Sequence, residues 1–167
     1  IPVTGISINK PTGCMYVGDK FKLDVVVLPE NALNKKYTLK SLDEKVATID
    51  KDGVVTLNSY GKAKIQATTE DGGFTDVCEF DVYEHTTGVR LSTESARIKK
   101  DDKFSLTAVI LPEGKNDGML RWSSDDEDIA SVDEDGVISG KSKGEAVITV
   151  TTVDGGYTAT CKVQVYQ

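Results

Sequence analysis

Residues Gly144–Tyr166 read GEAVITVTTVDGGYTATCKVQVY, and residues Gly61–Tyr83 read GKAKIQATTEDGGFTDVCEFDVY. Each stretch contains two segments in which apolar and polar residues alternate, which is the pattern of a strand with one buried face. Between the segments lies Asp-Gly-Gly, whose glycines supply the positive φ that a tight turn requires. We therefore predict a long antiparallel hairpin in each half of the chain.

The two hairpins belong to a longer repeat, because each residue of the first half corresponds to the residue 83 positions later without a gap. Matching pairs include Leu28-Pro29-Glu30 with Leu111-Pro112-Glu113, Asp52-Gly53-Val54 with Asp135-Gly136-Val137, and Cys78 with Cys161. A repeat of this length is typical of duplicated domains rather than of a short solenoid unit. We therefore predict two domains, residues 1–83 and residues 84–167.

Each domain is predicted to be a small all-β sandwich. Turn signals recur every 8 to 12 residues, which favours about seven short strands per domain. One strand is expected at Lys20–Leu28 and its counterpart at Lys103–Leu111, since apolar and polar residues alternate there. The core residues that the sandwich predicts are Phe21, Leu23, Leu39 and Ile65 in the first domain and Phe104, Leu106, Trp122 and Ile148 in the second.

The charge of the chain argues against nucleic acid and anionic lipid as partners. The 167 residues carry a net charge of -7 and the pI is about 4.8, whereas phosphate groups are held by clustered Lys and Arg. Residues 1–83 hold 10 basic and 12 acidic residues, and residues 84–167 hold 10 and 15. No apolar run approaches the roughly 20 residues of a bilayer-spanning helix, so we expect no direct membrane insertion.

Catalysis is not expected. The single histidine, His85, falls between the two repeats, and no Ser, Cys or Lys has an evident base partner, so a nucleophilic triad is not indicated. The acidic residues cluster in turns, where Asp is an ordinary turn residue, rather than as a pair of carboxylates facing a cleft. With three cysteines and no Cys/His metal spacing, the chain also lacks the pattern of a zinc site.

Calcium is the one cofactor for which the sequence offers candidates. Carboxylate oxygens are the ligands that Ca²⁺ prefers, and the second domain places five aspartates in two short runs: Asp125, Asp126, Asp128, Asp133 and Asp135. The runs do not fit an EF-hand loop, because a loop that begins at Ser131 has Ser142 in the place of its bidentate Glu. The alternative is that these acids are solvated turn residues, and no other cofactor is expected.

The residues of the second domain also resemble a known family. The segments that carry the resemblance are Val89-Arg90-Leu91, Leu120-Arg121-Trp122-Ser123-Ser124, Ile129-Ala130-Ser131-Val132, Asp135-Gly136-Val137-Ile138-Ser139-Gly140 and Gly144–Val150. They are similar to group 2 bacterial immunoglobulin-like (Ig-like) domains, which occur in tandem in bacterial and phage surface proteins such as the intimin and invasin adhesins. The resemblance implies two tandem Ig-like sandwiches without catalytic residues. The first domain departs from it, with Leu39 in place of the core Trp and Leu57 in place of a turn Gly.

The resemblance has one consequence for the cysteines. In Ig-like sandwiches the segment after the first strand runs beside the last strand, which would bring Cys14 near Cys78 and allow a disulfide worth about 3 to 4 kcal/mol. The alternative is that Cys78 and its counterpart Cys161 are buried small apolar residues.

Three tyrosines of the first domain are candidates for a binding surface. Tyr16, Tyr37 and Tyr60 are expected to face outward, and the second domain has Lys99, Leu120 and Lys143 in their places. Such a surface would take a peptide or a glycan. Scattered surface tyrosines are the ordinary alternative.

The link between the domains suggests a mechanical role. Only residues 84–87 separate the two predicted sandwiches, and so short a linker cannot act as a flexible tether. We expect the sandwiches to stack end to end as a rod.

The chain is interpreted as an excerpt of a longer parent chain at the bacterial cell surface, in a secreted protein or in a phage virion. There it serves as a spacer or adhesion segment that presents another domain. The alternatives are a module that binds a host surface protein or glycan directly, and accessory domains of a secreted glycan-degrading enzyme.

Overall fold

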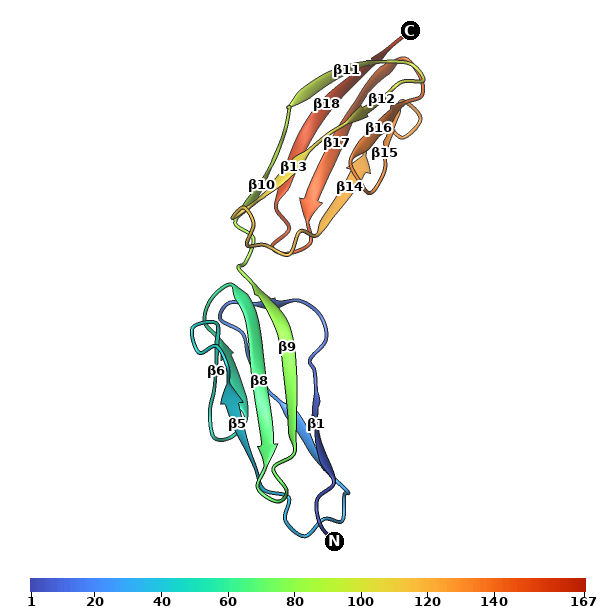
Figure 1. Ribbon diagram of the computed structural model, residues 1–167. Helices are drawn as coiled ribbons and strands as arrows, with labels where there is room; N and C mark the ends of the chain where they lie inside the picture. The colour runs from blue at the N-terminus through green and yellow to red at the C-terminus, as the bar shows by residue number, and fades with distance from the viewer. The chain divides into compact units, whose positions relative to one another are not determined.

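The computed structural model describes residues 1–167 and contains strands but no helix, which confirms the all-β class. It therefore has no helix with the length and apolar character needed to span a bilayer. The chain divides into two compact units, Ile1–Glu84 and His85–Gln167, one residue after the boundary predicted from the repeat. Unit 1 holds strands β1 to β9 and unit 2 holds strands β10 to β18 (Figure 1).

Unit 1 is a sandwich with one four-stranded sheet in the order β2-β9-β8-β5. These strands span Met15–Tyr16, Thr75–Tyr83, Gly61–Thr69 and Tyr37–Ser41. The opposite layer consists of the pair β1-β4 and the three-stranded group β3-β7-β6. Its strands are β1 Gly5–Asn9, β4 Asp24–Leu28, β3 Lys20–Lys22, β7 Val54–Leu57 and β6 Ala47–Ile49. All neighbours pair antiparallel except β2 and β9, which are parallel.

Unit 2 repeats this topology. Its four-stranded sheet has the order β11-β18-β17-β14, and the opposite layer consists of β10-β13 and β12-β16-β15. The strands of the sheet are β11 Ser95–Lys99, β18 Thr158–Tyr166, β17 Gly144–Thr152 and β14 Leu120–Ser124. Those of the opposite layer are β10 Gly88–Leu91, β13 Ala108–Leu111, β12 Lys103–Ser105, β16 Val137–Gly140 and β15 Ala130–Val132. The hairpins predicted from the repeated sequence are β8-β9 and β17-β18.

The core of each unit lies between its two layers. In unit 1, Ile65 is fully buried, Leu23 is 5% exposed, and Phe21 and Leu39 are partly buried against the same cluster. Phe21 also meets the ring of Phe80 edge to face, with centroids 5.7 Å apart. In unit 2, Ile148 and Leu106 are buried, and Phe104 and Trp122 pack against the cluster while remaining partly exposed. Burial of such side chains is the main favourable contribution to folding.

The strand predicted at Lys20–Leu28 is two strands in the structure. Its first part, β3, pairs with β7, and its second part, β4, pairs with β1, so the chain changes partner at Leu23. The Leu23 N–H donates to the carbonyl of Gly53 at 2.9 Å, and the equivalent Leu106 N–H donates to Gly136 at 2.9 Å. The alternation of side chains does not reveal this break, because Leu23 stays buried through it.

The two units differ at the edge of their four-stranded sheets. Strand β11 pairs with β18 over five residues, whereas β2 pairs with β9 over two. In unit 2 the close approach of β11 requires Gly140, because a Cβ there would lie 3.1 Å from both the Ile98 side chain and the Lys99 carbonyl oxygen. In unit 1 the same position is Leu57, which is 1% exposed. Unit 1, which has Leu57 where unit 2 has Gly140, therefore also has the shorter edge strand, β2.

Candidate functional site

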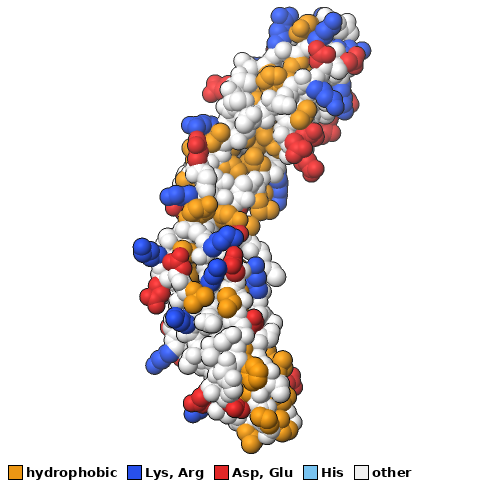
Figure 2. All heavy atoms as spheres, in the orientation of Figure 1, with side chains coloured by type: hydrophobic (Ala, Val, Ile, Leu, Met, Phe, Trp, Pro, Cys, Tyr) orange, Lys and Arg blue, Asp and Glu red, His pale blue; other side chains and the backbone are white.

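The acidic runs of unit 2 cap turns. Figure 2 shows carboxylates gathered on the β14–β16 side of this unit. The Asp133 carboxylate accepts hydrogen bonds from the N–H groups of Asp135 and Val137, each at 2.9 Å. The Asp125 carboxylate accepts one from Val147 N–H at 2.7 Å. Turns of this kind use Asp because its short side chain can reach the backbone N–H groups ahead of it.

The five candidate aspartates are not gathered into one cluster. No three His, Cys, Asp or Glu side chains lie close enough together to hold a metal ion. Asp125 accepts a hydrogen bond from Val147 N–H of strand β17, and Asp126 accepts one from Asp128 N–H in the turn after β14. Asp133 accepts hydrogen bonds from Asp135 and Val137 N–H in the turn before β16. These hydrogen bonds account for Asp126 and Asp133 as turn residues, and calcium binding by the five aspartates stays a prediction.

The disulfide predicted between Cys14 and Cys78 is not formed. The parallel register of β2 and β9 pairs Met15 with Val82, which places Cys14 beside Asp81, three residues from Cys78. Three residues of strand span about 10 Å, whereas a disulfide needs its Cα atoms within about 7 Å. Cys78 also points into the core and is 4% exposed, while Cys14 is exposed.

This arrangement predicts how the three thiols react. In the native protein Cys14 is expected to react readily with a maleimide, whereas Cys78 and Cys161 react only after unfolding. Burial raises the pKa of both buried thiols and also blocks access to them. Mass spectrometry of labelled peptides measures the result, and rapid labelling of Cys78 in the native state would contradict it.

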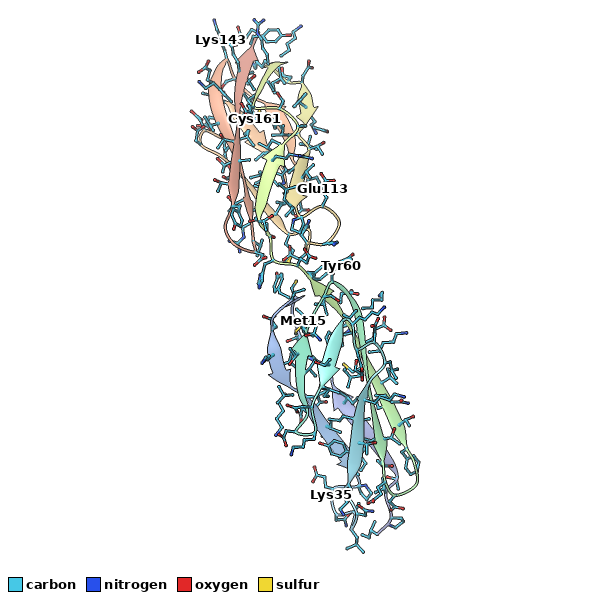
Figure 3. All side chains as sticks on the ribbon, turned by 90° about the vertical axis from the view of Figure 1, so that its left-hand side faces the viewer. Met15, Lys35, Tyr60, Glu113, Lys143 and Cys161 are labelled. Atoms are coloured by element: carbon cyan, nitrogen blue, oxygen red, sulfur yellow. The ribbon has the colours of Figure 1, made fainter.

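The three candidate tyrosines do not form one surface. Tyr37 pairs with Thr69 at one end of β8, and Tyr60 immediately precedes Gly61 at the other. A nine-residue strand is about 26 Å long, and Figure 3 labels Tyr60 and Lys35 at opposite ends of unit 1. Tyr16 pairs with Tyr83 near the Tyr60 end and is only partly exposed. A single peptide or glycan surface built from all three is therefore not present.

The first residues of each unit are held by a hydrogen bond to an aspartate, which the sequence did not predict. The Asp154 carboxylate accepts a hydrogen bond from Thr86 N–H at 2.7 Å and lies 3.3 Å from His85 Nδ1. In unit 1 the equivalent Asp71 accepts one from Val3 N–H at 3.0 Å. Sequence reasoning had identified both aspartates only as turn residues. Both aspartates are the first residue of the repeated Asp-Gly-Gly, and this shared position could have indicated that they have the same role.

The charge of Asp154 is stabilised by its neighbours. Burial raises the pKa of this carboxyl, but the hydrogen bond from Thr86 N–H and the contact with His85 lower it more, so the net pKa falls below its ordinary value of 3.8. A carboxyl with a lowered pKa stabilises the folded state at every pH above its unfolded value. The contribution disappears as the pH falls through the lowered pKa.

We expect Asp154→Ala to destabilise unit 2 by about 1–3 kcal/mol at pH 7, the range for a hydrogen bond to a charged group. The difference from the wild type should shrink as the pH falls through the lowered pKa of Asp154 and vanish once the carboxyl is protonated in both the folded and the unfolded state. Urea unfolding followed by Trp122 fluorescence measures it. The equivalent change in unit 1, Asp71→Ala, is the control, and a loss of stability that persisted unchanged at low pH would contradict the assignment.

An open hollow lies beside Trp122 in unit 2, with a volume of about 720 Å³. We call it the Trp122 hollow. Its apolar wall includes Leu106, Ala108 and Trp122, and its charged rim includes Arg121, Glu134 and Asp135. Sequence reasoning placed Trp122 in the core. Its partial exposure depends on what the neighbouring strands leave uncovered, which no local pattern reveals.

Unit 1 has a hollow at the equivalent place, with a volume of about 410 Å³. There Leu39 replaces Trp122, Thr38 replaces Arg121 and Lys51 replaces Glu134. Tyr37 also lines the hollow of unit 1, in the place of Leu120, so the two hollows differ in volume and in the position of their aromatic ring.

The chain matches the family described as bacterial Ig-like domain (group 2) twice, over residues 2–80 and 85–163. Among curated relatives, an uncharacterized protein of Clostridium acetobutylicum is 29% identical over 97% of the chain, which spans 17% of that protein. The Ig-like virion protein of Serratia phage KSP90 is 39% identical over 49% of the chain, which corresponds to 32% of its length. An alpha-L-arabinofuranosidase of Bifidobacterium longum is 33% identical over 74% of the chain, which corresponds to 12% of the enzyme.

Among solved structures, a C-terminal fragment of intimin, in complex with the intimin-binding domain of its translocated receptor, aligns with 98% of the chain. That alignment covers 64% of the fragment, with a TM-score of 0.46 and 20% identity. The chain thus spans less than a third of the first two relatives named above.

Proposed function

Because the chain belongs to the bacterial Ig-like domain (group 2) family, we propose that it is a non-catalytic extracellular spacer. In this proposal it forms part of a bacterial cell-surface or phage-particle protein and presents another domain of the same parent chain. The relatives support it, since each contains the matching region as a fraction of a longer chain, and one of them is a virion protein.

One observation supports the mechanical part of the proposal above all others. Unit 1 ends at Glu84, and by Thr86 the chain is already held by Asp154. The next residue, Thr87, donates its N–H to the Leu111 carbonyl at 2.8 Å. Only Glu84 therefore lies between Tyr83, the last strand residue of unit 1, and His85, whose side chain lies 3.3 Å from Asp154 of unit 2. A connection this short restricts bending and suits units that transmit force through paired strands.

Small-angle scattering of the two-unit chain tests this role. We expect a distribution of interatomic distances with the long tail that an extended pair of sandwiches produces, ending at a well-defined maximum distance. A matched control inserts eight Gly and Ser residues between Glu84 and His85, which should broaden the distribution because such linkers behave as flexible coils. A compact, side-by-side pair in the unmodified chain, or no change on insertion, would contradict the spacer role.

A second candidate is favoured by the arabinofuranosidase similarity. The matching region accounts for 12% of that enzyme, so the two units would serve as accessory domains of a secreted glycan-degrading enzyme. The sequence of the parent chain distinguishes the two candidates. A catalytic domain on the same chain favours the accessory role, and a surface anchor or a virion assembly domain favours the spacer.

A further inference from the structure

We infer that the Trp122 hollow of unit 2 is a binding site for a short neutral oligosaccharide. This inference does not depend on the spacer role. It rests on the Trp122 indole in the apolar wall of the hollow and on the hydrogen-bonding groups of its rim. The equivalent hollow of unit 1 has Leu39 and Thr38 in place of Trp122 and Arg121, and it is lined instead by Tyr37, Asp50, Lys51 and Asp52.

The indole of Trp122 is held in place by the turn beneath it. A Cβ on Gly136 would lie 2.7 Å from Trp122 Cζ2 and 2.6 Å from the Leu106 carbonyl oxygen, so the ring occupies the space that a side chain would fill. Trp122 also packs against the core cluster of unit 2. A ring fixed in this way is already organised for contact, and binding against it costs little conformational entropy.

The rim offers hydrogen-bonding groups that the protein does not use internally. The ion pairs of unit 2 join His85 to Asp154 and Arg90 to Glu113, so Arg121, Glu134 and Asp135 lie outside them. The turn that carries Glu134 and Asp135 is closed by the Asp133 carboxylate, not by theirs. The guanidinium is a donor and the two carboxylates are acceptors, so both kinds of group face the hollow.

This combination matches the chemistry of a sugar. A pyranose ring has an apolar C–H face that can lie on an indole, and its hydroxyl groups both donate and accept, as the mixed rim requires. Two carboxylates against one guanidinium, within residues 84–167 that hold 15 acids and 10 bases, disfavour an anionic ligand. The volume of about 720 Å³ falls within the range of small-molecule sites.

An extended peptide is the alternative occupant. Strand β14 is the last strand of its sheet, and its residues Leu120, Arg121 and Trp122 line the hollow, so a peptide could add to this strand through backbone hydrogen bonds. Such binding would use the backbone of β14 and would be largely independent of the side chains of Arg121 and Asp135. Substitution of Arg121 or Asp135 therefore distinguishes the two occupants, because it should weaken the binding of a saccharide but not that of a peptide.

The experiment uses the intact chain and its single tryptophan. Emission of Trp122 is titrated with neutral tetrasaccharides of glucose, xylose, arabinose and galactose, with tetragalacturonate as the anionic comparison. We expect a saturable change with at least one neutral tetrasaccharide at micromolar to millimolar concentration, and at least tenfold weaker binding of the anionic one.

The variants Arg121→Thr and Asp135→Ala should each weaken binding at least tenfold without shifting the midpoint of thermal unfolding. The first introduces the residue that unit 1 has at this position, and neither side chain takes part in closing the turn. The matched control is Asp52→Ala, the change equivalent to Asp135→Ala in unit 1, which should leave binding unaltered.

Absence of a saturable change with every saccharide up to 10 mM overturns the inference. So does binding that survives both rim substitutions, since that result indicates contact with the backbone of β14 or with another surface. Neither outcome bears on the scattering test of the spacer role, because that test measures only the shape of the chain.

Discussion

The Gly136→Ala variant is expected to lose about 2–4 kcal/mol of stability in unit 2, whereas Gly53→Ala loses about 1 kcal/mol in unit 1. The two glycines occupy the same turn of the repeat with nearly the same backbone, φ 82° and φ 84°. Both variants are therefore destabilised, because alanine disfavours a left-handed backbone conformation. Only at Gly136 does the added methyl group meet fixed atoms.

The contacts explain the difference. A Cβ at position 136 would lie 2.6 Å from the Leu106 carbonyl oxygen and 2.7 Å from the Trp122 ring, and neither can move without disturbing the core. At position 53 the nearest atom is a methyl group of Leu39 at 3.5 Å, which is ordinary contact. Urea unfolding of each variant, followed by far-ultraviolet circular dichroism, measures the losses. Equal losses would show that backbone strain alone decides the outcome.

The Ile65→Ala variant is expected to lose about 2–5 kcal/mol in unit 1 alone, the range for removal of a fully buried Ile side chain. The chain offers a direct way to see which unit is affected, because its single tryptophan is in unit 2. Circular dichroism should therefore reveal an early transition that the Trp122 fluorescence does not report.

Ile148→Ala is the matched variant, since Ile148 is the repeat counterpart of Ile65 and is also fully buried. It should shift the fluorescence transition and leave the transition of unit 1 in place. Each unit has its own core cluster, which is the physical reason for expecting independent unfolding. If Ile65→Ala shifts the fluorescence midpoint as far as Ile148→Ala does, the two units unfold as one and the expectation fails.

Much of the fold could be predicted because its signals are local. The hairpins β8-β9 and β17-β18 follow from alternation on both sides of Asp-Gly-Gly, and the glycines of that motif do have positive φ. The repeat extended the prediction to the whole chain. The break at Leu23 was missed, because a buried residue continues the alternation even where the strand changes its partner.

The candidate sites were harder to predict, because each depends on register between distant segments. Cys14 immediately precedes β2, which pairs with the strand that holds Cys78, but the register places Cys14 beside Asp81. Tyr37 and Tyr60 lie on one sheet but at opposite ends of the same strand. The five aspartates are close in sequence, but their carboxylates accept hydrogen bonds at different places: in the turn after β14, in the turn before β16 and on strand β17.

The amino-acid sequence alone was enough for the class of fold, the duplication, the positions of the hairpins and most of the core, because these follow from periodicity, turn chemistry and self-similarity. The tertiary structure was needed to find the Asp154 contact with Thr86, which joins residues 68 positions apart, and to show that Trp122 stays partly exposed beside a hollow. Both depend on which segments meet across the sandwich. Pairing and packing between distant segments set those distances, and no pattern within a single segment contains them.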